Sequence, residues 1–207
     1  MYKRLFFITL SVAGMLGPAG FAGAEEADEP ERVAKGLMLF HEGRMIFSPC
    51  RERSYVEVQD ASPDGVVTTA LRGLGLAQDR PLYTEVYGEA VGGSLRMTGL
   101  NFAHVQARCG GAREGTGPWL AVGRDPAWSI VTTSDVLRLH VAGQAATESA
   151  FSEKRAPTVT TLSTDAGSVQ WELRREPCYQ LEDGFASGWS AKGRVGGKAL
   201  SGCAWKP

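Results

Sequence analysis

Apolar and polar residues alternate along much of the chain, and this pattern predicts β-strands. Residues 54–59, S-Y-V-E-V-Q, show the period of a half-buried strand, and the turn formers of residues 60–65 end it. One helix is expected over residues 66–76, where apolar residues stand at helical spacing, and Gly73 and Gly75 predict that it is short. The pattern therefore predicts an all-β protein with mostly antiparallel sheets.

The predicted strands fall into two groups on either side of a glycine-rich stretch. Four glycines and one proline occur within residues 110–118. Short strands separated by polar turns favour antiparallel sheets or a small barrel. We therefore expect two small β domains, residues 33–113 and residues 118–207, joined by a linker at residues 114–117. In the second half we expect strands at residues 119–122, 127–132, 136–141, 158–162, 169–173, 189–195 and 199–205.

The first 24 residues have the pattern of a Sec-type signal peptide. Lys3 and Arg4 precede a largely apolar run, and A-G-A at residues 22–24 is a cleavage signal. We expect cleavage after Ala24, followed by a flexible acidic leader over residues 25–32. Glycines and a proline interrupt the apolar run, which disfavours a membrane-spanning helix. The expected mature protein is a periplasmic monomer that does not insert into the membrane.

Charge and composition exclude some classes of partner. The chain has 22 Lys and Arg against 23 Asp and Glu, a formal net charge of −1. Nucleic acids and anionic lipids are bound through dense basic patches, which a nearly neutral chain does not favour. We therefore expect no nucleic-acid partner, whereas 43% hydrophobic residues are ample for a core.

The four cysteines, Cys50, Cys109, Cys178 and Cys203, predict disulfides in an exported protein. Four cysteines allow three pairings. Position favours Cys50–Cys109 and Cys178–Cys203, because each pair then stays within one half of the chain. Neither pair has the C-x-x-C spacing of a redox or zinc site. We expect no free thiol in the exported protein.

Two segments of the second half resemble a family of uncharacterised bacterial envelope proteins. Residues 123–130, G-R-D-P-A-W-S-I, resemble the family's G-N-E-P-F-W-x-V signature, and residues 200–204 match its closing L-x-G-C-A. Arg124, Asp125 and Ala127 depart from the signature, whereas Trp128 and Cys203 match it. The resemblance covers roughly residues 118–205 and implies an envelope location.

The first half is similar to the OB-like C-terminal domain of the envelope lipoprotein NlpE. The shared segments are F-S-P-C at residues 47–50 and P-L-Y-T-E-V-Y-G at residues 81–88. The lipobox and C-x-x-C motif of those proteins are missing from this sequence. The similarity implies an OB-like barrel over residues 33–113, and a stress-related, non-enzymatic role as an envelope sensor or scaffold.

Motifs for catalysis and metal binding are incomplete. His41 begins an H-E-x-x-H pattern that ends in Met45, and no G-x-S-x-G occurs. We therefore predict no enzyme, no metal and no cofactor. Two alternatives stay open: a hydrolase that uses His104 or His140, and a small-ligand or copper carrier. The soft copper ligands of the second alternative would be Met38, His41, Met45 and Met97.

All five tryptophans lie in the second half. The core of a small barrel is the expected place for such rings, and an aromatic ligand site is the alternative. If a ligand pocket exists, the predicted binding residues are Arg124, Trp128 and Trp189. The leading prediction is a non-enzymatic periplasmic binding or scaffold protein whose partner is another envelope protein or a small ligand.

Overall fold

The computed structural model describes residues 32–110, 117–164 and 169–207. The expected signal peptide, nearly all of the leader and residues 114–116 of the linker lie outside the described residues. Strands dominate, and one short α-helix is present in the described parts of the chain. The prediction of an all-β protein with mostly antiparallel sheets is confirmed. Residues Glu31–Pro207 form one compact unit.

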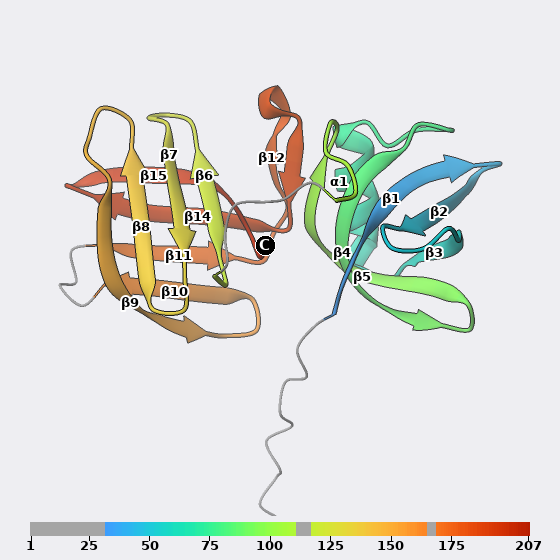
Figure 1. The fold of residues 1–207 in the computed structure, drawn as a ribbon, viewed down its shortest axis with the longest axis horizontal. Helices are drawn as coiled ribbons and strands as arrows, with labels where there is room; N and C mark the ends of the chain where they lie inside the picture. The colour runs from blue at the N-terminus through green and yellow to red at the C-terminus, as the bar shows by residue number, and fades with distance from the viewer. Residues whose placement is uncertain (1–31, 111–116, 165–168) are drawn as a thin grey trace, which may run out of the picture. The chain divides into compact units, whose positions relative to one another are not determined.

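Five strands form the first module (Figure 1). They pair in the closed order β1-β2-β3-β5-β4-β1, with β3 parallel to β5 and every other pair antiparallel. A five-stranded barrel of this non-sequential order, with its helix between β3 and β4, agrees with the predicted OB-like architecture. The strands are β1 (Val33–His41), β2 (Arg44–Pro49), β3 (Val56–Asp60), β4 (Leu82–Val91) and β5 (Ser94–His104).

The helix α1 (Val66–Leu74) follows the 3-10 turn η1 (Pro63–Gly65) and packs its apolar face on the core of the first module. It ends two residues before the predicted limit, because Gly75 adopts a left-handed conformation with φ of 113°. The carboxylate of Asp60, at the end of β3, accepts a 2.8 Å hydrogen bond from the Thr68 backbone N–H. This bond caps the first turn of the helix from the neighbouring strand.

Eight further strands close into an antiparallel barrel, called the barrel below (Figure 1). Their order is β6-β7-β8-β9-β10-β11-β14-β15, and β15 pairs again with β6. The predicted small antiparallel barrel is therefore confirmed. The strands are β6 (Leu120–Gly123), β7 (Trp128–Thr132), β8 (Val136–Val141), β9 (Thr147–Arg155), β10 (Val159–Thr164), β11 (Gln170–Arg174), β14 (Trp189–Val195) and β15 (Lys198–Trp205).

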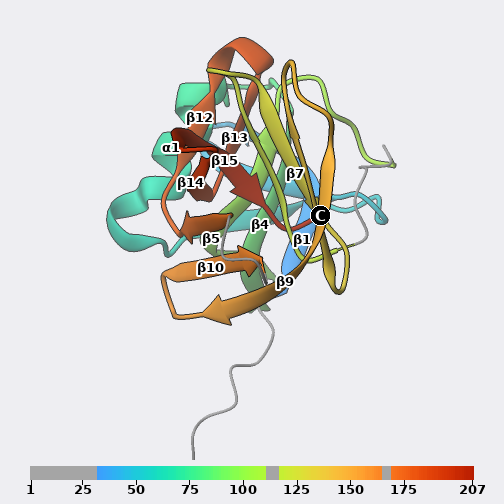
Figure 2. The same cartoon turned by 90° about the vertical axis from the view of Figure 1, so that its left-hand side faces the viewer.

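One hairpin leaves the barrel and joins the first module. It comprises β12 (Cys178–Gln180), the 3-10 turn η2 (Leu181–Asp183) and β13 (Phe185–Ser187), and it lies in sequence between β11 and β14. β13 pairs antiparallel with β5, with Ala186 opposite Ala103. Figure 2 shows the hairpin beside β15. Residues from the expected second domain, 118–207, therefore add two strands to the sheet of the expected first domain, 33–113.

Tryptophan rings form the centre of the barrel core. Trp119, Trp128, Trp171 and Trp189 are all buried in one cluster with aliphatic side chains. Gly193 on β14 makes room for one of them, since a Cβ there would lie 2.5 Å from the Trp171 ring. A third cluster contains residues of both the first module and the barrel, including Phe102 and Trp205.

Candidate functional site

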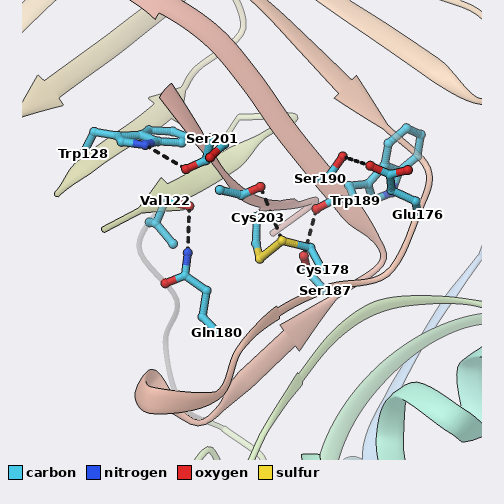
Figure 3. The surroundings of a disulfide bond; sticks show 11 residues. Val122, Trp128, Glu176, Cys178, Gln180, Ser187, Trp189, Ser190, Ser201 and Cys203 are labelled. Atoms are coloured by element: carbon cyan, nitrogen blue, oxygen red, sulfur yellow. Dashed lines mark hydrogen bonds between the residues drawn. A yellow bond between two sulfur atoms is a disulfide. The ribbon is translucent and has the colours of Figure 1, made fainter. Parts of the chain in front are cut away.

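Both expected disulfides are present, Cys50–Cys109 and Cys178–Cys203, with Cα–Cα distances of 5.2 and 5.4 Å. All four cysteines lie in the described residues, and none of them is free. The second disulfide links β12 of the hairpin to β15 of the barrel (Figure 3). It therefore ties the hairpin to the barrel at the point where the chain leaves the barrel strands.

Polar contacts add to this attachment. Gln180 donates through Nε2 to the backbone carbonyl of Val122 on β6 at 3.2 Å, and Ser187 Oγ donates to the carbonyl of Trp189 at 3.0 Å (Figure 3). On its other side the hairpin pairs with β5 through β13. The hairpin is thus bonded to the barrel and to the first module at once.

Arg124, the first of the predicted binding residues, also contacts the hairpin. Its guanidinium lies 2.7 Å from the Glu182 carboxylate and 3.3 Å from that of Asp183, both in η2. About half of the Arg124 side chain is exposed. Exposed ion pairs of this kind contribute little to stability, so Arg124 orients the tip of the hairpin more than it stabilises the fold.

Trp128 and Trp189 lie inside the barrel, each in contact with another ring. The Trp128 ring centroid is 4.4 Å from that of Trp171, and Trp189 meets Trp119 edge-on at 4.9 Å. Within residues 32–110, 117–164 and 169–207, no hydrogen bond or ring contact joins Arg124, Trp128 and Trp189 to one another. The two rings serve core packing, and their role in ligand binding stays a prediction.

A buried carboxylate, Glu85 on β4, stands on the outer side of the first module. Its side chain has 0% exposure and accepts hydrogen bonds from Tyr83 Oη at 2.5 Å and from Asn101 Nδ2 at 3.0 Å. The ammonium of Lys35 lies 3.7 Å away and supplies the opposite charge. Burial of a carboxylate is costly unless hydrogen bonds and an opposite charge compensate for the lost water, and Glu85 has both.

Asn101, the single asparagine of the chain, joins this cluster to the end of the barrel. Its amide donates to Glu85 and to the Lys206 carbonyl at 2.7 Å. Its oxygen accepts from the Lys206 backbone N–H at 2.9 Å and from Tyr87 Oη at 3.2 Å. An asparagine side chain has two donor hydrogens and two acceptor lone pairs, and all four are used here. We call this set of contacts the Asn101 junction.

The ammonium of Lys206 lies over aromatic rings from both parts of the molecule. It is 5.8 Å from the Tyr87 ring of the first module, and 5.4 and 5.7 Å from the rings of Trp119 and Trp189 in the barrel. These are cation–π distances. The backbone and the side chain of Lys206 therefore both help to hold the barrel against β4 and β5.

Sequence reasoning missed Glu85 and Asn101 as a site. Residues 81–88 alternate as a strand, and a polar residue at every second position normally marks a solvent-exposed face. In the structure this face is covered by residues that follow Asn101 by about a hundred positions. Two tyrosines and one glutamate, at residues 83, 85 and 87, are the available signal, but they do not identify the covering segment.

The histidines occupy three different settings. His41 Nδ1 bonds to Asp79 at 2.8 Å in an exposed turn, and this bond raises the pKa of His41 above its usual range. Burial lowers the pKa of His104, whose Nδ1 accepts backbone N–H groups of the residues two and three positions ahead. His140 faces Ser129 across β7 and β8, and no hydrogen bond between their side chains occurs in the described structure.

The methionines considered as copper ligands are core residues. Met38, Met45 and Met97 belong to the buried cluster of the first module, whereas His41 is exposed. Across the described ranges, no group of three or more His, Cys, Asp or Glu side chains is placed to hold a metal ion. The four candidate ligands are thus divided between the interior and the surface.

Comparison with protein-family models, with curated proteins and with solved structures finds no significant match to this chain. Among the described residues, no helix is long and apolar enough to cross a membrane.

Proposed function

We propose that the protein is a non-enzymatic binding or scaffold protein of the bacterial envelope that acts in the periplasm. The observation that carries this proposal is the Asn101 junction. Two fully buried polar side chains, Glu85 and Asn101, bond to each other, and Asn101 also bonds to the Lys206 backbone. Side chains arranged in this way position two β modules for recognition by a partner.

The periplasmic location is supported by the signal-peptide pattern of the first 24 residues and by two disulfides. Disulfides form and persist in oxidising compartments such as the periplasm. The similarity of the first half to the NlpE domain adds a stress-related role to the proposal. Cell fractionation, with mass spectrometry of the purified mature chain, tests the location: an N-terminus at Glu25 supports export, and retention of Met1 contradicts it.

The hairpin offers a surface on which a protein partner can be sought. Tyr179 and Leu181 are large apolar residues with 44% and 61% exposure. Apolar residues exposed near each other often mark interaction surfaces. A photo-reactive amino acid at position 181, expressed in cells, should form a discrete adduct with an envelope protein. The matched control carries the same group at position 148 on the exposed strand β9 and should give no such adduct.

The same cells separate the scaffold from an enzyme. Loss of an envelope-dependent phenotype in His104→Gln or His140→Gln, with unchanged cross-linking at position 181, would support a hydrolase and overturn the proposal. If both variants keep the phenotype and the adduct, the binding role is supported. If no adduct forms at position 181, either in normal growth or under envelope stress, the proposal of a protein partner is contradicted.

A small-ligand carrier is the second candidate, and two indole groups favour it. The Nε1 atoms of Trp171 and Trp189 are buried without a hydrogen-bond partner among the residues the structure describes. A buried donor without a partner is costly, and a bound polar ligand or water would satisfy it. Native mass spectrometry of protein purified from the periplasm tests this candidate: a retained ligand supports a carrier, and the bare chain mass favours the scaffold.

A further inference from the structure

A groove of about 460 Å³ lies along four neighbouring strands of the barrel, β10, β11, β14 and β15. Its walls include Thr161, Glu172, Lys192 and Ser201, which stand directly opposite one another from strand to strand. The side chains between them along each strand, such as Trp171 and Leu200, point into the barrel core. Because side chains alternate along a strand, the groove lies on the outer face of the barrel.

Differences in side-chain length create this hollow. β15 contributes the short residues Ala199 and Ser201 to the groove, opposite the long residues Arg194 and Lys192 of β14. Lys192 and Arg194 rise from β14, and Gln170 and Glu172 from β11. Small residues beside long ones leave a floor that the long side chains border.

The groove carries an excess of positive charge. Glu172 is bonded to Arg174, its neighbour two positions along β11, although Lys192 is its cross-strand partner. Lys192 and Arg194 make no ion pair or side-chain hydrogen bond with any described residue. Two cations two residues apart on one strand have Cα atoms separated by about 7 Å. They therefore point at the same region of the groove.

We propose that this groove binds a small ligand that carries at least two phosphate or carboxylate groups. Lys192 supplies a compact ammonium charge, and Arg194 supplies a planar fork that bonds two oxygens of one anionic group. Thr161 and Ser201 offer hydroxyl donors, and Gln170 offers an amide donor. The volume of the groove admits a ligand much larger than a single inorganic ion. This site does not depend on the function proposed above.

The test uses the whole mature protein, labelled with ¹⁵N, and two probes, pyrophosphate and citrate. At low ionic strength each probe should shift the amide resonances of β11, β14 and β15 in a saturable manner, with a Kd below about 1 mM. The affinity should fall as salt is added, because the two cations are exposed to screening. Acetate, which carries one charge, should bind much more weakly.

Variants separate this site from general attraction of anions. Lys192→Gln/Arg194→Gln should weaken binding by about tenfold or more, since both charge-assisted contacts are lost. Arg44→Gln/Arg96→Gln removes the same charge from the first module and should leave the affinity unchanged. Glu172→Gln removes the carboxylate from the groove and should strengthen binding, a gain that damage to the fold would not produce.

The outcomes decide the proposal and the chemistry of the ligand. Binding of pyrophosphate alone assigns phosphate, binding of citrate alone assigns carboxylate, and binding of both assigns any small ligand with two or more anionic groups. Resonance shifts spread over the whole surface, equal losses in the two double variants, or no saturation would overturn the proposal. Binding to vesicles that contain phosphatidylglycerol, with no binding of either small probe, would also overturn it.

Discussion

Replacement of Asn101 by alanine is the most informative change for the stability of the protein. It removes four hydrogen bonds at a fully buried position. The Glu85 carboxylate loses its amide donor, and the Lys206 backbone loses a partner on both its N–H and its carbonyl. The affected groups then need new partners or water in a region that is now closed to solvent.

The expected loss follows from the number and type of these bonds. An ordinary hydrogen bond contributes about 0.5–1.5 kcal/mol net, and a bond to a charged group about 1.5–3 kcal/mol. Because water can replace part of what is lost once the junction opens, we expect Asn101→Ala to lower the free energy of unfolding by about 3–5 kcal/mol. Tyr87→Phe removes a single bond of the same set and should cost about 1 kcal/mol.

Urea unfolding of the mature protein, followed by far-ultraviolet circular dichroism and by tryptophan fluorescence, measures these changes. Gln59→Ala is the matched control, because it removes an exposed amide on β3 and should change stability by less than about 0.5 kcal/mol. A loss below about 1 kcal/mol in Asn101→Ala, similar to that of the control, would show that the Asn101 junction does not stabilise the fold. Tyr87→Phe still tests the junction if Asn101→Ala does not fold.

Three further predictions concern single side chains. Asp60→Ala removes the helix cap and should lower the free energy of unfolding in urea by about 1–2 kcal/mol. Burial alone would raise the pKa of Asp60, but hydrogen bonds from Ser62 and Thr68 outweigh burial and lower this pKa. The stabilisation by Asp60 is therefore present above the usual Asp pKa and is lost as the pH falls through the lowered value. In an NMR titration His41 should titrate above the usual histidine pKa and His104 below it. His104 therefore destabilises the fold as the pH falls below about 6.5. The stabilisation by the His41–Asp79 pair is instead lost as the pH rises through the raised pKa of His41. Lys206→Met should lower stability by about 0.5–2 kcal/mol through the lost cation–π contacts, and Lys206→Arg should retain most of it. A single shared histidine pKa, an Asp60→Ala variant as stable as the wild type, or equal stabilities of the two Lys206 variants would contradict these expectations.

Local sequence patterns predicted the elements whose residues divide between core and solvent. The helix face of α1 and the strands around Trp128 and Trp171 all place buried residues at the expected spacing. The disulfide pairing also followed from sequence position. These features depend on short-range periodicity or on the small number of possible pairings, which a sequence contains directly.

Strand β9 was not predicted because most of its residues are exposed on both faces. Nearly every residue of Thr147–Arg155 is exposed, so T-E-S-A-F-S-E-K-R lacks the alternation that marks a half-buried strand. Backbone pairing with β8 and β10 holds it in the barrel. The hairpin was missed for a different reason: β12 and β13 have three residues each, too few to show a period.

Long-range contacts explain the rest of the difference. Asn101 is followed by Phe102 and Ala103 in a run that reads as an ordinary buried strand. Nothing local indicates that its partners are Glu85 on the adjacent strand and Lys206 at the other end of the chain. The barrel core was the expected place for the tryptophan rings, and Trp128 and Trp189 lie there, but sequence alone does not separate a packed ring from one that lines a site.

The hairpin and the Asn101 junction should make the first module and the barrel one cooperative unit. Native-state hydrogen exchange with increasing urea tests it most directly, by comparing the slowest amides of β4 with those of β14. We expect the same opening free energy and the same urea dependence for both strands in the wild type, and a parallel decrease of the two opening free energies in Asn101→Ala. Opening free energies that differ by more than about 1 kcal/mol in the wild type, with β14 unaffected by Asn101→Ala, would instead show that the first module and the barrel are two independent units.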